Sequence, residues 1–235
     1  MTSPRSLRSL FNPLFALLTS FIIKNELFKK NEVYNTKYQD IKLSNMHISV
    51  LSASTRINRA SHRVALALEQ YINGQGIHTA KILDLAEYRF PVLEEILHRH
   101  PNPPDGLEAF AAEIRGSDAC IFVSPEYNGS YTSALKNAID YLKEGEFAQK
   151  AIGIAGVSAG MMGGMRAGLA MQQLALAISG FPAPQMLLVG QVTQRFDEVG
   201  NLTDPSFEKN IQAFLKQFTW LAEAVADKKM ALVAG

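Results

Sequence analysis

The residues best suited to chemistry stand at positions 124–129, SPEYNG, directly after the apolar run 119–123. That run is short and rich in β-favouring residues, so we expect a strand in the middle of a parallel sheet. Pro125 removes an amide donor and biases Ser124 toward an extended conformation, so the chain should leave the sheet there. Glycine lets the backbone approach a flat ligand, asparagine both donates and accepts hydrogen bonds, and tyrosine adds a planar face. We therefore predict a loop that cups an aromatic ring system, formed by Glu126, Tyr127, Asn128 and Gly129.

Two other polar loops are predicted to follow strands. The first, SASTRINRAS at residues 52–61, lies between a predicted strand at 47–52 and a predicted helix at 61–73. Hydroxyl groups and backbone amides at a helix N-terminus favour an anion such as phosphate. An ordinary capped turn between strand and helix is the alternative. Neither a P-loop nor a Rossmann dinucleotide fingerprint follows this strand.

The second loop, SAGMMGG at residues 158–164, follows a predicted strand at 149–157. In open α/β sheets, ligands bind outside the carboxyl ends of the strands. We therefore expect this loop and the Tyr127 loop to flank one crevice, although the glycines could simply form a tight turn.

The elements that must position these loops alternate between strand and helix, which favours a parallel sheet covered by helices on both faces. Residues 135–142 carry an apolar stripe at helical spacing, and Thr132 or Ser133 is the expected cap. The remaining elements are predicted as strands at 77–85 and 185–189, helices at 107–115 and 165–179, and a last helix starting at Pro205. Residues 86–105 are expected to form a long irregular loop with one helical turn at 93–97.

Three residue types that often mark sites are interpreted differently here. The single cysteine, Cys120, lies in a predicted buried strand and is interpreted as core. Trp220 is expected in the core or at its rim. His98 and His100 lack a carboxylate or cysteine at supporting spacing, so no metal site is predicted.

The run SPEYNGSYTSALKNAIDYL closely resembles the signature segment of the NADPH-dependent FMN reductase family, flavodoxin-like enzymes that include quinone, azo-dye and chromate reductases. The family's Pro-x-Tyr-Asn loop and the Leu-Lys-Asn-Ala-Ile-Asp segment after it are matched by Pro125, Tyr127, Asn128 and residues 135–140. The alternative is an unrelated strand-loop-helix unit of another α/β protein. The resemblance implies a flavodoxin-like three-layer sandwich with a five-stranded parallel sheet in the order 2-1-3-4-5.

Two further family motifs have counterparts in this sequence. The family's Gly-Ser-x-Arg run with a following serine is matched by Ser54, Arg56 and Ser61, with Ala53 in place of the glycine. Its Ser-x-Gly-x-x-Gly-Gly-x-Arg run is matched by Ser158, Gly160, Gly163, Gly164 and Arg166. The resemblance implies bound FMN, with the cofactor contacted by Ser54, Arg56, Ser61, Pro125, Glu126, Tyr127, Asn128, Gly129, Ser158 and Gly160.

The same resemblance implies an NAD(P)H-dependent reductase that passes two electrons through FMN to a quinone, an azo compound, free flavin or a similar small acceptor. NADPH or NADH is the expected co-substrate, and Arg56 could meet either the flavin phosphate or that of the nucleotide. The flavin carries the reaction, so no catalytic side chain is assigned. Glu126 and Tyr127 are the nearest candidates. A non-enzymatic flavodoxin-type electron carrier is the alternative function.

Composition and charge limit the kinds of partner that the chain is expected to bind. The chain of 235 residues is 47% hydrophobic, enough for one sizeable core. Its net charge of +1, without basic runs interleaved with aromatics, gives no indication of nucleic-acid binding. The resemblance implies a homodimer or homotetramer, because the almost wholly apolar segment 165–179 needs cover on both sides. A cytoplasmic location is expected.

Residues 1–45 differ from the remainder: they carry a net charge of +4, against −3 for residues 46–235. Their apolar run at 10–23 is too short to span a bilayer comfortably, and no small-x-small cleavage site follows it. We interpret 1–45 as an N-terminal extension or a misassigned start, and 46–235 as the reductase domain. A targeting or membrane-associating segment and a packed accessory element are the alternatives.

Overall fold

The computed structural model describes residues 45–142 and 144–233. The predictions for the extension fall on residues outside this part, apart from Asn45. Within it, six strands form a single sheet. They are β1 (His47–Ser52), β2 (Thr79–Asp84), β3 (Ala119–Pro125), β4 (Ala151–Val157), β5 (Phe181–Pro182) and β6 (Leu187–Val189).

The strand order is β2-β1-β3-β4-β5, with every pair parallel, which confirms the predicted order. The fifth position differs in detail, because β5 and β6 both pair with β4. The first pairs with its start at Ala151 and the second with its end at Val157. Pro182 and Pro184 supply no amide donor in the stretch between these contacts, which accounts for the interrupted edge.

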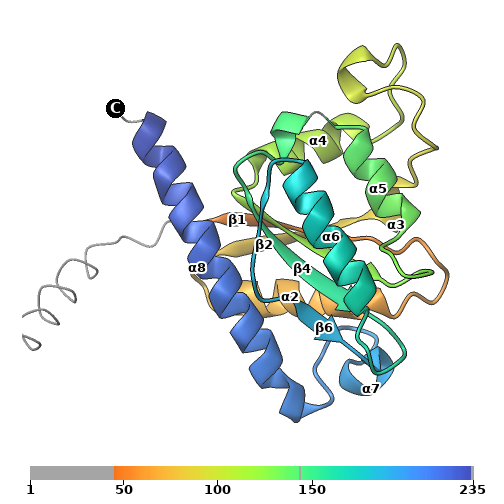
Figure 1. Cartoon of the computed structure of the whole chain (residues 1–235), viewed down its shortest axis with the longest axis vertical. Coiled ribbons are helices and arrows are strands. Elements are labelled where there is room, and N and C mark those ends of the chain that lie inside the picture. Colours follow the sequence, from red (N-terminus) through yellow and green to blue (C-terminus); the bar gives the residue numbers. More distant parts are fainter. Residues whose placement is uncertain (1–44, 143, 234–235) are drawn as a thin grey trace, which may run out of the picture. The chain divides into compact units, whose positions relative to one another are not determined.

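Helices cover both faces of the sheet (Figure 1). They are α2 (Ser61–Gly74), α3 (Leu85–Tyr88), α4 (Leu107–Gly116), α5 (Ser133–Asp140), α6 (Met165–Ala177), α7 (Val192–Arg195) and α8 (Glu208–Val233). Short 3₁₀ segments occur at Leu97–Arg99, Glu144–Glu146 and Pro205–Phe207. Residues of α2 and α8 pack with one face of the sheet, and those of α4, α5 and α6 pack with the other.

The prediction of an irregular segment at 86–105 was partly wrong. Asp84, at the end of β2, accepts a hydrogen bond from the Ala86 amide and thereby caps the short helix α3. The single helical turn expected at 93–97 forms later, at Leu97–Arg99. By contrast, the predicted cap of α5 is confirmed, and of the two candidates Thr132 and Ser133 it is Thr132, whose Oγ1 accepts from the Leu135 amide at 3.2 Å.

The core forms on both sides of the sheet. Phe214 and Phe218 of α8 are fully buried and stack with their rings 6.0 Å apart. Cys120 is buried as predicted, and burial raises the pKa of its thiol to about 11. Trp220 is 68% exposed, so its expected place in the core or at its rim was wrong. It lies on α8 away from the buried stripe that includes Phe214, Phe218 and Ala222.

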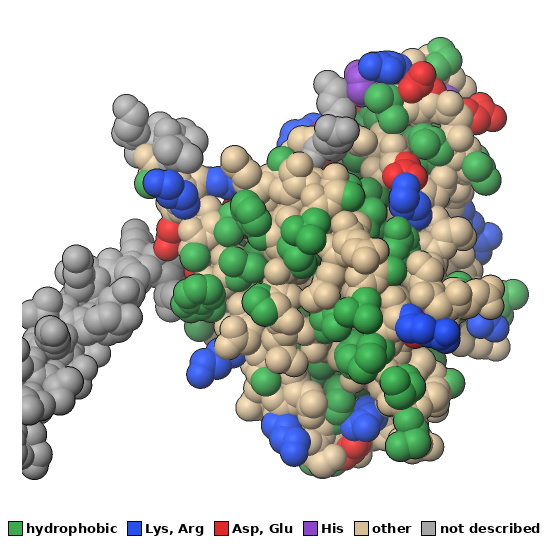
Figure 2. All heavy atoms as spheres, in the orientation of Figure 1, with side chains coloured by type: hydrophobic (Ala, Val, Ile, Leu, Met, Phe, Trp, Pro, Cys, Tyr) green, Lys and Arg blue, Asp and Glu red, His purple; other side chains and the backbone are tan. Residues whose placement is uncertain are grey.

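One face of α6 carries exposed apolar side chains, and no other segment among residues 45–142 and 144–233 buries them. Met165, Leu169 and Leu176 are 38%, 50% and 63% exposed, and the neighbouring Met161 and Met162 are 85% and 66% exposed. Figure 2 shows hydrophobic side chains gathered on the face of the molecule where α6 lies. The opposite side of the same helix, including Met171, is buried against the sheet. Helix α6 therefore has apolar residues on both sides, as the sequence predicted.

Candidate functional site

The candidate site is a cleft of about 300 Å³ where the loops after β1, β3 and β4 meet. Because these strands are parallel, their carboxyl ends share one edge of the sheet. The cleft is lined by Ser54, Arg56, Asn58, Arg59, Ala60, Ser61, Pro125, Glu126, Tyr127, Val157, Ser158, Ala159, Val192 and Thr193. The predicted crevice between the Tyr127 and Ser158 loops is therefore present, with the Ser54 loop as its third side.

The first loop, residues 53–60, joins β1 to α2. Its start continues the sheet, because the Ala53 amide donates to the Val123 carbonyl at 2.9 Å. Ser54 is buried, and its Oγ lies 3.0 Å from the Tyr127 hydroxyl. The exposed Arg56 guanidinium lies 5.6 Å from the centre of the Tyr127 ring. These contacts bring together two predicted site segments that are more than seventy residues apart in the chain.

Helix α2 begins at this cleft without a side-chain cap. Its N-cap is Ala60, which has no side-chain oxygen to offer the first amides. No acidic residue lies in the first turn. The first turn itself therefore carries no negative charge against the helix dipole, and Ser61 adds a hydroxyl group beside it. This end of α2 has the chemistry of an anion site.

Arg59 is a lining residue that the sequence analysis did not single out. Its Nη1 donates to the Ser54 carbonyl at 3.0 Å, and its two terminal nitrogens donate to the two carboxylate oxygens of Asp84. His62 lies beside this pair, with Nδ1 2.9 Å from Ser52 Oγ and 3.7 Å from the Asp84 carboxylate. Burial lowers the pKa of His62, and the negative charge of Asp84 opposes that shift.

The Tyr127 loop is a tight hairpin turn. The Tyr127 amide donates to the Ser130 carbonyl at 2.8 Å, and the reverse bond is 3.1 Å. Asn128 and Gly129 both have positive φ, +51° and +85°, as a type I′ turn requires. Neither residue lines the cleft, so the predicted cofactor contacts of Asn128 and Gly129 stay predictions.

Glu126 joins this turn to the start of α6. Its carboxylate accepts from the Arg166 backbone amide at 3.2 Å and from Nε at 2.6 Å, and Nη2 lies 2.5 Å away. The Glu126 side chain is 13% exposed, whereas that of Arg166 is 73% exposed. Because these bonds occupy the Glu126 carboxylate, we interpret Glu126 as a structural link between the Tyr127 turn and the start of α6.

The loop after β4 forms another wall of the cleft. Ser158 lines the cleft, and its hydroxyl donates to the Gly160 carbonyl at 2.8 Å. Gly160 does not line the cleft, so its cofactor contact stays a prediction. Gly163 and Gly164 have φ of +62° and +72°. A Cβ on Gly164 would lie 2.5 Å from the Val157 nitrogen, so close packing against β4 explains this glycine.

Sequence reasoning also missed the wall formed by Val192 and Thr193 at the start of α7. No local motif marks these residues. The Val192 amide donates to the Ser158 carbonyl at 3.3 Å, which brings α7 to the cleft. The pairing of β6 with the end of β4 also brings this later segment of the chain to the site.

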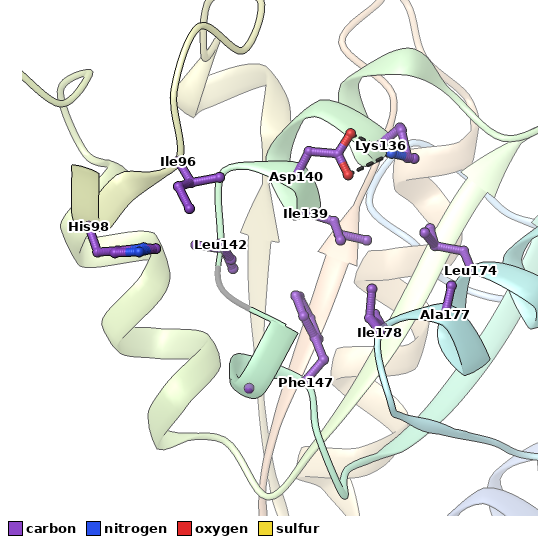
Figure 3. Close-up of a pocket in the computed structure, with 11 residues that line it drawn as sticks. Ile96, His98, Lys136, Ile139, Asp140, Leu142, Phe147, Leu174, Ala177 and Ile178 are labelled. Atoms are coloured by element: carbon purple, nitrogen blue, oxygen red, sulfur yellow. Dashed lines mark hydrogen bonds and ion pairs between the residues drawn. The ribbon is translucent and has the colours of Figure 1, made fainter. Parts of the chain in front are cut away.

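A larger hollow of about 610 Å³ lies elsewhere, between α5, α6 and the 3₁₀ segment at Glu144–Glu146 (Figure 3). Apolar side chains such as Ile139, Phe147 and Leu174 line it. An ion pair between Lys136 and Asp140 borders it. None of the predicted cofactor residues lines this hollow, so it is not the candidate site.

The described part of the chain shows no sign of two other kinds of site. Residues 45–142 and 144–233 hold no group of three or more His, Cys, Asp or Glu side chains placed to bind a metal ion. In the same part, no helix is both long and apolar enough to cross a membrane.

Comparisons with known proteins bear on the same residues. The sequence model of the NADPH-dependent FMN reductase family matches residues 46–194. A quinone reductase from Pseudomonas putida is 32% identical over 182 residues, covering 74% of this chain and 94% of the relative. An NAD(P)H-dependent FMN reductase from Pseudomonas aeruginosa is 32% identical over 177 residues, covering 72% and 92%.

Among solved structures, the flavoenzyme NAD(P)H:(acceptor) oxidoreductase FerB from Paracoccus denitrificans is similar, with a TM-score of 0.65 at 23% identity. The match covers 76% of this chain and 98% of that one, and it shows a shared fold. Together with the family match over more than half of the sequence, these similarities lead to one conclusion. The chain belongs to the NADPH-dependent FMN reductase family.

Proposed function

We propose that this protein is an oxidoreductase that holds FMN in the cleft and passes two electrons from NADPH or NADH to a quinone, an azo compound, free flavin or a similar small acceptor. Family membership favours an enzyme over an electron carrier. The observation that carries the proposal is the meeting of an anion-binding loop and a tyrosine-bearing loop in one cleft. Ser54 Oγ and the Tyr127 hydroxyl are 3.0 Å apart there.

The residues present fit the parts of FMN. A phosphate needs amide and hydroxyl donors and positive charge, which the uncapped start of α2, Ser61 and Arg56 supply. A planar ring needs flat or apolar walls, and Tyr127, Val157 and Val192 line the same cleft. When bound, FMN supplies a carrier that can take a hydride equivalent from a nicotinamide and return two electrons to an acceptor.

The contribution of the chain is binding, orientation and exclusion of water. Ser54 and Tyr127 hold each other in place, so each enters the cleft in a set position. Glu126 fixes the Tyr127 turn to the start of α6 through Arg166. Val157 and Val192 line the cleft with apolar, almost fully buried side chains, so they offer water no hydrogen-bond partner there. We assign no proton transfer to any of these side chains, because hydride and electron transfer proceed through the cofactor.

The first experiment is an absorbance spectrum of the purified full chain, followed by anaerobic addition of NADPH or NADH. We expect flavin bands that bleach with the nucleotide and return on addition of a quinone. Bound flavin that neither nucleotide reduces would instead support the electron-carrier alternative. Failure to bind FMN after reconstitution would contradict both functions.

The phosphate contacts are tested by replacing Ser54 and Arg56 together with alanine. We expect FMN to bind at least about tenfold more weakly, because a hydroxyl donor and a positive charge are both lost. Arg115→Ala is the control, because Arg115 pairs with Glu146 and does not line the cleft. If the double variant binds FMN as tightly as the wild type, the phosphate does not bind at this loop.

The exposed side of α6 supports a homodimer or homotetramer. Leu169 is 50% exposed and Leu176 is 63% exposed, and a second copy could cover both. Leu169→Glu should shift the sedimentation coefficient of the purified chain toward that of a monomer. Gln217→Glu, an exposed polar position on α8, which packs on the other face of the sheet, is the matched control. An oligomer that survives Leu169→Glu would place the contact on another surface.

We further propose residues 46–235 as the reductase domain, 1–45 as an extension, and the cytoplasm as its location. The family match beginning at residue 46 supports the domain start. Protein expressed from Met46 should bind FMN as tightly as the full chain, and mass spectrometry of the native N-terminus should reveal the start used in cells. Cell fractionation tests the location, and recovery with membranes would contradict it.

A further inference from the structure

Arg59 and Asp84 link the first loop to the end of β2. Both terminal nitrogens of Arg59 reach the Asp84 carboxylate, and Nη1 also donates to the Ser54 carbonyl at 3.0 Å. Their side chains are 19% and 7% exposed. The two carboxylate oxygens and the guanidinium face each other in the forked geometry that suits arginine and that lysine cannot reproduce.

The loop needs such a link because its tip has little other support. Thr55, Arg56, Ile57 and Asn58 are all exposed, and Ile57 is 90% exposed. Asn58 also has a positive φ of +56°, which is an uncommon conformation for a residue other than glycine. Arg59 follows this turn and reaches back to Ser54, which precedes it. The loop is thus closed by one side chain.

The link also sets the direction of a backbone amide. A trans peptide places its carbonyl and the next amide on opposite sides. With the Ser54 carbonyl held on Arg59, the Thr55 amide must point away from that guanidinium. If the link broke, the peptide unit could turn and present a carbonyl oxygen to an anion in place of an amide.

We propose that Arg59 and Asp84 are positioning residues that preset the phosphate-binding conformation of loop 53–60. Arg59 acts on the anion through the Ser54 and Thr55 backbone, since its own charge is already paired with Asp84. The proposal rests on FMN as the occupant of the cleft. It adds that the affinity for the phosphate part of FMN depends on a carboxylate at the end of β2 that does not line the cleft.

The test compares FMN with riboflavin, which lacks the phosphate. Each flavin is titrated by fluorescence into full-length protein stripped of its cofactor, for Arg59→Met, Asp84→Asn and the double variant. We expect each single variant to lose about tenfold in FMN affinity, with riboflavin changed by less than about twofold, because only the preset anion site is lost. The double variant should lose no more FMN affinity than the single variant with the larger loss, since both changes break the same link.

Arg63→Met is the matched control. Arg63 lies in the first turn of α2 with a side chain that is 21% exposed and paired with Glu198, but it donates to the Phe196 carbonyl and not to the loop. Its FMN affinity should stay within about twofold of the wild type. Arg59→Lys adds a second check, because a lysine keeps the charge and loses the fork, so it should rescue little.

The outcomes separate the possibilities. If Asp84→Asn keeps or gains FMN affinity while Arg59→Met loses it and Arg59→Lys restores it, Arg59 binds phosphate directly and the proposal is wrong. Equal losses for FMN and riboflavin would mean that the pair only supports the fold, which also overturns it. Thermal unfolding of each variant is measured first. If Asp84→Asn does not fold, the FMN and riboflavin affinities of Arg59→Lys are compared with those of Arg59→Met instead. A wild-type protein that binds neither flavin would contradict the proposed function itself.

Discussion

Gly164→Ala probes whether the glycines after β4 are required by packing. Gly164 has φ of +72°, and a Cβ there would lie 2.5 Å from the Val157 nitrogen and 2.9 Å from its carbonyl oxygen. Real Cβ contacts are essentially never that short, so the backbone would have to move. Val157 belongs to β4, which is held by β3 on one side and β6 on the other. The strand therefore has little freedom to give way.

The expected cost has two parts. An alanine held in the left-handed region costs about 1 to 2 kcal/mol, and overpacking a close-packed site costs about 1 to 3 kcal/mol. Together they lower the free energy of unfolding by about 2 to 5 kcal/mol. For a domain of this size, that corresponds to a fall in Tm of about 4 to 20 °C.

Gly160→Ala is the control in the same loop. A Cβ at Gly160 would meet nothing within 4 Å, and its φ lies outside the left-handed region. Its unfolding free energy should therefore stay within about 0.5 kcal/mol of the wild type. Thermal unfolding of both flavin-free variants, followed by circular dichroism, makes the comparison. A Tm of Gly164→Ala within about 1 °C of the wild type, or an equal loss in Gly160→Ala, would refute the packing argument.

Three further predictions concern side chains near the core. Thr132→Val should lower the free energy of unfolding, measured by urea denaturation, by about 2 to 4 kcal/mol, because the Ala53 carbonyl and the Leu135 amide both lose their hydrogen-bond partner. A loss below about 1 kcal/mol would contradict this. Burial raises the pKa of Cys120 to about 11, so iodoacetamide should label the native protein at least about a hundredfold more slowly than the urea-unfolded protein, and equal rates would count against burial. Burial lowers the pKa of His62 from 6.5, so the unfolded chain binds the proton first and stability should fall as the pH drops below that value. The Tm of His62→Gln should fall less than that of the wild type as the pH drops through this range. Equal falls in Tm for the two proteins would show that other groups cause the loss of stability.

The sequence alone was sufficient for the fold and for the expectation that three loops meet at one edge of the sheet. Short apolar runs and helical patterns predicted the strands β1 to β4 and the main helices after them, and Thr132 was one of the two caps predicted for α5. These signals are local, because a strand, a cap or a turn depends on residues within a few positions of each other. The crevice followed from one topological rule, since parallel strands place their carboxyl ends on one edge.

Tertiary structure decided which side chains meet. Arg59 and Asp84 are 25 positions apart, and Glu126 and Arg166 are 40 apart, so no local pattern could pair them. The exposure of Trp220 depended on which side of α8 the sheet covers. Asn128 and Gly129 were recognised by type, yet only the fold shows that they form the turn while Tyr127 reaches the cleft. Side-chain partners far apart in sequence are set by the packing of whole elements, and that packing is a property of the folded chain.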